Sequence, residues 1–486
     1  MCFIIDLRKE IFMRKTKIIC TVGPACSNEE TLTNMCLAGM NVARLNFSHG
    51  THKQHKEMID LVKKVREKLS LPIAIMLDTR GPEYRIKTFE NGKVTLSDGD
   101  EFTFTTEEII GNSKKVSVNY KGLIDDLEIG DTILVNNGLV SFKVKELSNT
   151  EALCTVVSGG ELSNQKSMSF PNKVLKQTFL SEQDKSDILF GIENDIDYIA
   201  ASFVSCEQDI IDIKSFIDEN RGSEIGIVAK IENRFGVDNI YDICKHCEGV
   251  MIARGDLGVE IPFKELPAVQ KKLITTCRML GKRIITATEM LETMIYNPRP
   301  TRAEISDVAN AVYDGTSAVM LSGETAAGKF PVQTVKIMSD ICEETENNIH
   351  YNKRFHRDDF KIENNMDAIS HAACSMAIDV DARAIAVCSL SGKTARLVSR
   401  FRPVVDIIGL TTNKKAWRKL ALSWGVIPVM YEEYPSSEVM FYNASRKTQK
   451  ILQLEDGDNI IIVGGTTSGR SGETNTIRLE KISIKK

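Results

Sequence analysis

The sequence lacks three features that would assign it to other broad classes of protein: a long apolar run, a strong excess of one charge and a cysteine framework. No apolar run approaches the roughly 20 residues that a membrane-spanning helix needs. The short apolar stretch at the N-terminus is interrupted by Asp6, which argues against a signal peptide. The formal net charge is −4, so neither nucleic acid nor an anionic membrane is an expected partner.

The 12 cysteines follow no disulfide or zinc pattern. The only close pair is Cys244 and Cys247, and a structural zinc site would need a second pair nearby. Several other cysteines lie within apolar runs, where a thiol behaves as a small hydrophobic group. We therefore expect reduced thiols and a cytoplasmic location. Hydrophobic residues make up 42% of the chain, which is typical of a globular protein with a sizeable core.

Short apolar runs that end in clusters of polar residues recur along the chain. Most of them are followed by a helix-like stretch, and eight such strand–helix units predict a (β/α)8 TIM barrel. The runs are Lys17–Pro24, Asn41–Ser48, Ile73–Gly81, Asp197–Val204, Ile225–Glu232, Gly249–Leu257, Arg283–Met290 and Ala318–Thr325.

The pattern changes twice outside these runs. Between residues 88 and 170, short alternating runs separated by turn signals such as Asn91-Gly92 predict a small all-β domain, inserted over the barrel mouth as a lid. After a polar linker, alternating helices and strands predict a C-terminal α/β domain with a mostly parallel sheet. The expected boundaries are 1–12 for an N-terminal extension, 13–87 and 171–350 for the barrel, 88–170 for the lid and 351–486 for the C-terminal domain.

Polar residues at the ends of the fifth and sixth predicted strands suit a metal-bound anion. Glu232 and Asp256 end consecutive strands, and two carboxylates with substrate oxygens and water are what Mg2+ prefers. Alternatively, these carboxylates pair with Arg234 and Arg254. Lys230 lies two residues before Glu232, so both face the same side of the strand. A lysine on the inner face of a barrel is costly without an anion, which favours a functional site.

The second and third predicted strands end in several oxygen-bearing side chains. Arg44, Asn46 and Ser48 alternate on one strand, and Asp78 and Thr79 close the next. One carboxylate among neutral oxygens makes a cage of low charge, which suits a monovalent cation. Spacing alone leaves an ordinary polar loop open as the alternative.

Two segments approach the GxxxxGK spacing of a phosphate-binding loop without completing it. After residues 323–329, Phe330 replaces the hydroxyl residue that would hold magnesium, and Val387 replaces the first glycine before residues 391–394. Residues 389–394 still lie between a strand and a helix, where amides and hydroxyls can hold a phosphate. A simple helix cap remains the alternative.

Longer motifs identify a family. From about Met13 to its C-terminus the chain closely resembles pyruvate kinase, in the motifs KIICTVGPA, NVARLNFSHG, LDTRGPEYR, VAKIEN, ARGDLGVEI, ITATEMLETM, RPTRAEISDVANAVYDGTSAVMLSGETAAGKFP and TNTIR. The resemblance implies phosphoryl transfer from phosphoenolpyruvate to ADP in glycolysis, giving pyruvate and ATP. It also implies Mg2+ (or Mn2+) and K+ as cofactors, a phosphorylated effector in many members, and a homotetramer.

The resemblance also implies a role for individual residues. The implied catalytic residues are Lys230, which stabilises the transferring phosphoryl group, and Thr288, near the proton delivered to the enolate. The implied substrate contacts are Arg44, Lys230, Gly255, Asp256 and Thr288. The implied metal ligands are Glu232 and Asp256 for Mg2+, and Asn46, Ser48, Asp78 and Thr79 for K+. The implied nucleotide contacts are Asn46, His49, Arg85 and Lys166. The implied ligands of an effector phosphate are Ser389, Ser391, Gly392, Lys393 and Thr394.

Three departures from the family pattern stand out. The lid has Asn136-Asn137-Gly138 where Asp-Asp-Gly is usual, which removes two negative charges near the nucleotide. Arg80 replaces a usual lysine, and Ile86 replaces the threonine that is common in potassium-dependent members. Glu83, however, is the residue associated with potassium dependence.

Two other functions compete with this interpretation. A metal-dependent aldolase or lyase acting on pyruvate-like acids would share the metal carboxylates, but would not need Lys230 and Arg44 on a phosphate or this lid. A catalytically silent sensor would keep only the C-terminal ligand site. Intact Lys230, Glu232, Asp256 and Thr288 argue against the sensor.

Overall fold

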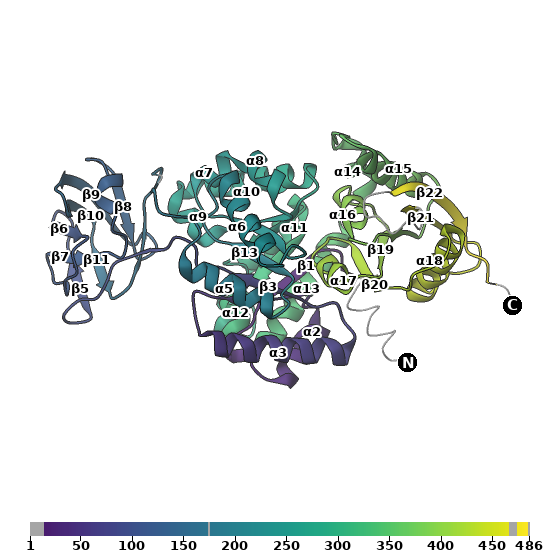
Figure 1. The fold of residues 1–486 in the computed structure, drawn as a ribbon, viewed down its shortest axis with the longest axis horizontal. Helices are drawn as coiled ribbons and strands as arrows, with labels where there is room; N and C mark the ends of the chain where they lie inside the picture. Colours follow the sequence, from purple (N-terminus) through teal and green to yellow (C-terminus); the bar gives the residue numbers. More distant parts are fainter. Residues whose placement is uncertain (1–13, 174, 466–473, 485–486) are drawn as a thin grey trace.

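Three units follow one another along the molecule, with the lid at one end, the barrel in the centre and the C-terminal domain at the other end (Figure 1). This computed structural model describes residues 14–173, 175–465 and 474–484. The predicted N-terminal extension, residues 1–12, lies outside the described residues. Among the residues described, none of the helices combines the length and apolar character needed to cross a membrane.

The central unit is a closed barrel of parallel strands in the order β1-β17-β16-β15-β14-β13-β3-β2. Each strand lies within one of the predicted apolar runs, so the barrel prediction is confirmed. The strands are β1 (Lys17–Thr21), β2 (Val42–Asn46), β3 (Ala74–Asp78), β13 (Tyr198–Ala201), β14 (Gly226–Ile231), β15 (Gly249–Ala253), β16 (Arg283–Ala287) and β17 (Ala318–Leu321).

Helices surround the barrel, so its strands are buried on both faces and read as almost continuous apolar runs. Polar caps begin several of these helices. At the start of α5, for example, the Ser181 hydroxyl accepts the backbone N–H of Asp184. The helices are α2 (Glu29–Ala38), α3 (His52–Leu69), α5 (Glu182–Glu193), α6 (Glu207–Glu219), α7 (Arg234–Asp238), α8 (Ile240–His246), α9 (Arg254–Glu260), α10 (Leu266–Met279), α11 (Arg302–Asp314), α12 (Gly323–Ala326) and α13 (Pro331–Asn347), with short 3-10 turns at Pro24–Cys26, Phe263–Glu265 and Glu292–Ile295.

The lid is all-β apart from one helical turn, α4 (Leu123–Asp126). Its main sheet has the order β4-β12-β8-β9-β10-β6-β7, and β11 pairs with β5 separately. The strands are β4 (Tyr84–Arg85), β5 (Lys93–Leu96), β6 (Glu101–Thr105), β7 (Lys115–Ser117), β8 (Thr132–Val135), β9 (Val140–Leu147), β10 (Glu151–Ser158), β11 (Gly160–Ser163) and β12 (Ser167–Ser169). The sequence interpretation missed β4, β11 and β12; β4 and β12, with two and three residues, are too short to show an alternation of their own.

The C-terminal domain has a five-stranded sheet in the order β20-β19-β18-β21-β22. Among the described strands of this sheet, β22 alone is antiparallel to its neighbour, which confirms the mostly parallel sheet. The strands are β18 (Ala384–Cys388), β19 (Asp406–Thr411), β20 (Val426–Met430), β21 (Asn459–Gly465) and β22 (Thr474–Lys481). The helices are α14 (Tyr351–Arg357), α15 (Asn365–Asp379), α16 (Lys393–Arg400), α17 (Lys414–Leu420) and α18 (Ser437–Leu452).

Buried ion pairs and hydrogen bonds join the C-terminal domain to the barrel floor, where the barrel strands begin. Arg418 of α17 donates to Asp197 at 2.6 Å, just before β13. The hydroxyl of Tyr198, the first residue of β13, donates to the carbonyl of Lys419 at 2.7 Å. The C-terminal domain therefore lies at the end of the barrel opposite to the predicted catalytic strand ends.

Candidate active site

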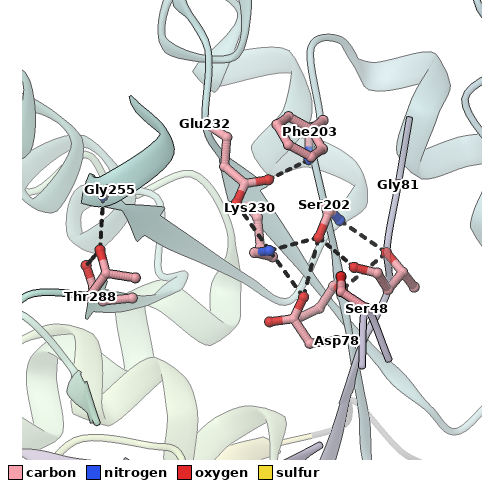
Figure 2. A network of polar contacts seen from close by, with 12 residues as sticks. Ser48, Asp78, Gly81, Ser202, Phe203, Lys230, Glu232, Gly255 and Thr288 are labelled. Atoms are coloured by element: carbon pink, nitrogen blue, oxygen red, sulfur yellow. Dashed lines mark hydrogen bonds and ion pairs between the residues drawn. The ribbon is translucent and has the colours of Figure 1, made fainter. Parts of the chain in front are cut away.

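The centre of the barrel mouth is a polar network around Lys230 of β14 (Figure 2). Its Nζ atom lies 3.0 Å from Asp78 Oδ1 and 3.0 Å from Glu232 Oε1, and donates to Ser202 Oγ at 2.6 Å. Asp78 ends β3, Ser202 follows β13 and Glu232 follows β14, so three strand ends supply the network. The side chain of Lys230 is 10% exposed, and those of Asp78 and Glu232 are each 1% exposed.

The charges in this network determine its protonation. Burial would lower the pKa of Lys230, but Asp78 and Glu232 outweigh it and hold that pKa above its ordinary value. Burial raises the pKa of Glu232 to about 7, although Lys230 acts in the opposite direction. Glu232 Oε2 also accepts the backbone N–H of Phe203 at 2.6 Å. Lys230 therefore stays charged, whereas Glu232 is held at the edge of ionisation, where a bound cation would favour the carboxylate.

Asp78 connects Lys230 to Arg44. The Nε atom of Arg44 lies 2.6 Å from Asp78 Oδ2, and its Nη1 atom donates to Thr21 Oγ1 at 2.8 Å. Burial would raise the pKa of Asp78, but Arg44 and Lys230 together lower it. One carboxylate thus lies between two cations, which are the two that the sequence predicted for a substrate phosphate.

Sequence reasoning missed Ser202 in this network. Its hydroxyl donates to the carbonyl of Thr79 at 2.7 Å and lies 3.2 Å from Asp78 Oδ1. The available signal was its position, because Ser202 closes the fourth apolar run as Asp78 closes the third. A serine at one strand end was a weaker signal than the charged residues at the others.

The predicted potassium ligands lie at two adjacent strand ends. Asn46 and Asp78 are register partners on β2 and β3, and Asn46 Oδ1 accepts the N–H of Ser48 at 3.1 Å. Thr79 Oγ1 accepts the N–H of Ser202 at 3.1 Å. The side chains offer neutral oxygens and one carboxylate. Because Arg44 and Lys230 also contact Asp78, its charge is shared with them.

A second part of the site lies at the ends of β15 and β16, apart from the network around Lys230 (Figure 2). The N–H of Gly255 donates to Thr288 Oγ1 at 2.9 Å, and this hydroxyl lies 2.6 Å from the carbonyl oxygen of Ala287. Thr288 and Glu289 have φ values of 69° and 53°, in the left-handed region that is costly for residues with a Cβ. Something must therefore hold this turn in place.

Arg254 holds the strained turn. Its Nη2 atom donates to the carbonyl of Thr288 at 2.6 Å and to the carbonyl of Glu289 at 3.0 Å. Its Nη1 atom pairs with Asp307 of α11 at 2.7 Å. The arginine thus fixes the backbone beside the Thr288 hydroxyl, a role that the sequence did not reveal.

These contacts overturn the ion-pair alternative for the metal carboxylates. Arg254 pairs with Asp307, and Arg234 pairs with Glu265. Neither arginine pairs with Glu232 or Asp256 among the residues that the structure describes.

Glu232 directly follows β14, and Asp256 lies in the first turn of α9, just after the neighbouring strand β15. The two carboxylates interact electrostatically, because Asp256 contributes to the raised pKa of Glu232. Within the described parts of the chain, no cluster of three or more His, Cys, Asp or Glu side chains could hold a metal by itself. Two carboxylates leave several coordination positions for oxygens of a substrate and of water, which is the donor set that Mg2+ takes at phosphoryl groups.

The predicted nucleotide contacts lie at the base of the lid and beside β2. Arg85 lies on β4, where its Nη1 atom donates to the carbonyl of Gln165 at 2.8 Å. The carbonyl of Lys166 accepts the N–H of Ile86 at 3.0 Å, so the strand of Arg85 and the segment of Lys166 are side by side. His49 is exposed just after β2.

Glu83, which fits the family pattern, and the Asn136-Asn137 pair, which departs from it, both have structural consequences. Glu83 forms a two-point ion pair with Arg85, at 2.9 and 3.0 Å, so its charge is directed at a predicted nucleotide contact. Asn136 and Asn137 form the turn between β8 and β9 with φ values of 57° and 55°. Asn and Asp both tolerate this conformation, so the turn keeps its shape while losing charge.

The predicted effector segment joins β18 to α16. Gly392 has a φ of 73° and caps α16. No side chain of the described residues caps this helix, so its first-turn amides can serve an acceptor. Thr394 is buried, and its Oγ1 atom lies 2.7 Å from Thr474 Oγ1 at the start of β22. Its hydroxyl is therefore engaged with β22.

Comparisons with known proteins agree with this architecture. Residues 13–335 match the family model "Pyruvate kinase, barrel domain", and residues 367–480 match "Pyruvate kinase, alpha/beta domain". The pyruvate kinase of Clostridium acetobutylicum is 43% identical, over 97% of this chain and 100% of that protein. The pyruvate kinase of Staphylococcus saprophyticus is 44% identical, over 97% of this chain and 81% of that protein.

A solved structure of a pyruvate kinase from Cryptosporidium parvum superposes with a TM-score of 0.91 and 37% identity, covering 97% of each chain. This similarity extends over barrel, lid and C-terminal domain together, so the aldolase alternative, which does not need this lid, loses its basis. The chain belongs to the pyruvate kinase family.

Proposed function

We propose that the chain transfers the phosphoryl group of phosphoenolpyruvate to ADP, giving pyruvate and ATP, at the barrel mouth around Lys230. The observation that carries the proposal is one buried, charged lysine held by Asp78 and Glu232, with Arg44 on the far side of Asp78. These two cations can also bind an anionic substrate, and a phosphate monoester supplies oxygens that both can contact.

Catalysis of phosphoryl transfer depends mainly on positioning the two substrates and on neutralising the charge of the phosphoryl group. Arg44 holds the substrate phosphate, and a phosphoryl oxygen takes the place of a carboxylate oxygen as an acceptor of the Lys230 ammonium. The bond between phosphorus and the enol oxygen breaks, and a bond to the terminal phosphate oxygen of ADP forms. The Lys230 charge stabilises the group in flight, when negative charge is spread over its oxygens.

The enolate that remains must gain a proton on carbon. Thr288 is the hydroxyl at this side of the mouth, and the N–H of Gly255 donates to it. Because that contact and the Arg254-bound backbone fix the hydroxyl, it can orient the proton donor over one face of the enolate. Gly255 and Asp256 border the same substrate position.

Two cations fit the remaining oxygens. Glu232 and Asp256 would hold Mg2+, or Mn2+, which when bound neutralises charge on the phosphoryl oxygens. The oxygens of Asn46, Ser48, Asp78 and Thr79 would hold K+. The family generally requires a divalent metal and K+, and these are the described residues whose donors suit each ion.

The other assignments concern ADP, an effector and assembly. Arg85 and Lys166 at the lid base, with Asn46 and His49 beside β2, would contact ADP when the lid closes. A phosphorylated effector would bind at residues Ser389, Ser391, Gly392, Lys393 and Thr394, where the uncapped first turn of α16 offers amide donors. We infer a homotetramer in the cytoplasm, on the family resemblance.

An assay of pyruvate formation tests the proposal. Pyruvate is measured with phosphoenolpyruvate and ADP, with and without Mg2+, K+ and sugar phosphates. We expect turnover that needs the divalent metal. Failure to form pyruvate under every cation condition would instead favour the catalytically silent sensor.

A further inference from the structure

A small cavity surrounded by basic side chains lies where the floor of the barrel meets the C-terminal domain. Its volume is about 10 Å³, which is room for a single water molecule or an ion of similar size. The barrel contributes Arg278 of α10, residues 281–283 and Ser317, which precedes β17. The C-terminal domain contributes part of α16 and, just after it, Arg402. Residues 389–394, the proposed effector position, do not line this cavity.

Positive charge predominates around the cavity. Six basic side chains line it, and no acidic side chain does so among the residues that the structure describes. Three of the six have a carboxylate partner outside the cavity, in the pairs Arg278 with Asp358 at 2.6 Å, Arg400 with Asp367 at 3.1 Å and Arg283 with Glu248 at 3.1 Å. The other three, Lys282, Arg396 and Arg402, form no ion pair within the described parts of the chain. The cavity therefore lies in a region of positive potential.

Arg402 is a buried cation whose contacts are with neutral groups. It is 4% exposed. Its Nη2 atom donates to the carbonyl of Gly315 and to Ser317 Oγ, both at 3.0 Å. Its guanidinium carbon lies 4.6 Å from the centre of the Trp424 ring. Because an arginine keeps its proton inside a protein and a buried charge normally has a partner of opposite sign, this side chain favours a nearby anion.

The neighbouring charges make the position of Arg402 still less favourable for a cation. Burial lowers the pKa of Arg402, and Arg278 and Arg354 lower it further. Glu346 acts in the opposite direction. The carboxylate of Glu346, however, is engaged elsewhere, since it accepts two backbone N–H groups just before β1 at 2.7 and 2.6 Å. The charge of Arg402 therefore remains largely uncompensated among the described residues.

Three buried arginine N–H groups at the cavity can share one acceptor. The Nε atoms of Arg278, Arg400 and Arg402 are buried and have no hydrogen-bond partner among the described residues. All three side chains line the cavity. Buried donors in folded proteins normally have an acceptor, which is often a water molecule or an ion. An acceptor in this cavity would serve arginines of the barrel and of the C-terminal domain together.

We propose that this cavity binds a single chloride ion between Arg278 of the barrel and Arg400 and Arg402 of the C-terminal domain. A halide ion is only slightly larger than a water molecule, whereas a phosphate group is too large for this volume. Water would accept the N–H groups but leave the positive charge without compensation. Because the walls belong to both units, the ion stabilises the C-terminal domain on the barrel floor.

Thermal unfolding of the full-length protein, without substrates, tests the proposal. Potassium chloride replaces potassium gluconate stepwise, so that ionic strength and K+ stay constant. We expect the unfolding temperature to rise with the chloride concentration, which gives an apparent dissociation constant. Arg402→Gln should weaken chloride binding at least about tenfold, because it removes a charged hydrogen-bond donor. Arg446→Gln, which changes an exposed arginine on α18, is the matched control and should keep the full response.

Ser317 allows a fixed negative charge to replace the ion, which keeps the test valid even where Arg402→Gln disturbs domain docking. Its Oγ atom accepts from Arg402 at 3.0 Å and from the backbone N–H of Ile284 at 3.1 Å. Ser317→Asp should raise the unfolding temperature in gluconate and abolish the response to chloride. Ser317→Asn, of the same size without the charge, should not raise that temperature.

Three results would overturn the proposal. The first is an unfolding temperature of the unaltered protein that is the same in both salts, as expected if water fills the cavity. The second is a full chloride response in Arg402→Gln, which would place the effect elsewhere. The third is equal behaviour of Ser317→Asp and Ser317→Asn, which would mean that filled volume and not charge determines stability at this position.

Discussion

Lys230 Nζ and Glu232 Oε1 lie 3.0 Å apart in a site from which most water is excluded, and the same ammonium lies 3.0 Å from Asp78. One cation therefore contacts two buried carboxylates before any substrate binds. This arrangement gives the lysine two tasks, because the group proposed to stabilise phosphoryl transfer also keeps the barrel mouth electrostatically balanced. Substitutions here should change stability and activity together.

Replacement of Lys230 by methionine should lower kcat by a factor on the order of 10³ or more, as for other groups that stabilise charge in a transition state. The change also leaves Glu232 buried without its cation, so the free energy of unfolding should fall by about 3 kcal/mol. Steady-state kinetics and denaturant-induced unfolding measure the two effects.

Lys264→Met is the matched control, because Lys264 is exposed on the short turn before α10 and should tolerate the same change in both measurements. A Lys230→Met protein with nearly normal turnover would refute the assigned role of this lysine.

The contact between Arg254 and the backbone of Thr288 leads to a second prediction. Arg254→Lys should reduce kcat between about 10- and 100-fold, because lysine lacks the planar fork that reaches both carbonyls of the strained turn. The KM for ADP should stay the same, since the proposed ADP contacts lie at the lid base. Kinetics at saturating and limiting ADP separate the two parameters.

Asp307→Asn is the control for the ion pair on the other side of Arg254. It leaves both contacts to the carbonyls in place, so its effect on kcat should be several-fold smaller than that of Arg254→Lys. Equal losses in the two variants would mean that the Asp307 ion pair, and not the turn, determines activity.

The barrel strands could be predicted because burial on both faces makes each of them an apolar run with a polar end. The hydrogen-bond and ion-pair partners of the polar residues at the strand ends could not be predicted in this way. Arg254 was weighed only as a counter-ion for Glu232 or Asp256, whereas it binds two carbonyl groups that point at it only because Thr288 and Glu289 have positive φ. Local sequence does not specify that conformation for a threonine followed by a glutamate.

The network around Lys230 shows a similar limit. Strand position was enough to place Lys230, Asp78 and Glu232 at one mouth, but not to show that a single ammonium would contact both carboxylates. Ser202 was overlooked since a hydroxyl at one strand end has no distinctive pattern. The pairing of Glu83 with Arg85 depends on the path of the chain from the barrel into the lid, which no periodicity describes.

Mg2+ binding should weaken below neutral pH. Burial raises the pKa of Glu232 to about 7, so protons compete with the metal for this carboxylate as the pH falls through 7. The dissociation constant of Mg2+ should rise about tenfold per pH unit from pH 7 toward pH 5 and level off above pH 8. Titration calorimetry in buffers of different ionisation enthalpy would detect the proton released on binding.

Glu260→Gln is the control, because burial raises the pKa of the Glu260 carboxyl group to about 7 as well, and Asp256 raises it further. The pH dependence of Mg2+ binding should persist in this variant. If the Mg2+ affinity of the unaltered protein stays constant between pH 6 and pH 8, Glu232 does not have to lose a proton to bind the metal, and the prediction is wrong.

Activity should depend on K+. The oxygens of Asn46, Ser48, Asp78 and Thr79 form the proposed cage, and the substrate phosphate would bring negative charge close to it in a partly desolvated site, where such repulsion is strong. Initial rates in a K+-free, tetramethylammonium-buffered assay should fall far below those at about 100 mM KCl, with ionic strength matched so that screening is equal. Equal rates in the two buffers would assign the cage a structural role.

Substitutions at Glu83 test whether a fixed positive charge can replace K+. Glu83→Lys should retain part of the rate without K+, because an ammonium group beside the cage supplies a resident charge. Glu83→Gln breaks the same ion pair with Arg85, whose two bonds measure 2.9 and 3.0 Å, without adding a cation. It should therefore keep the full K+ requirement while raising the KM for ADP. If both variants lose the K+ requirement to the same extent, the release of Arg85 would account for the effect, and the added charge would not.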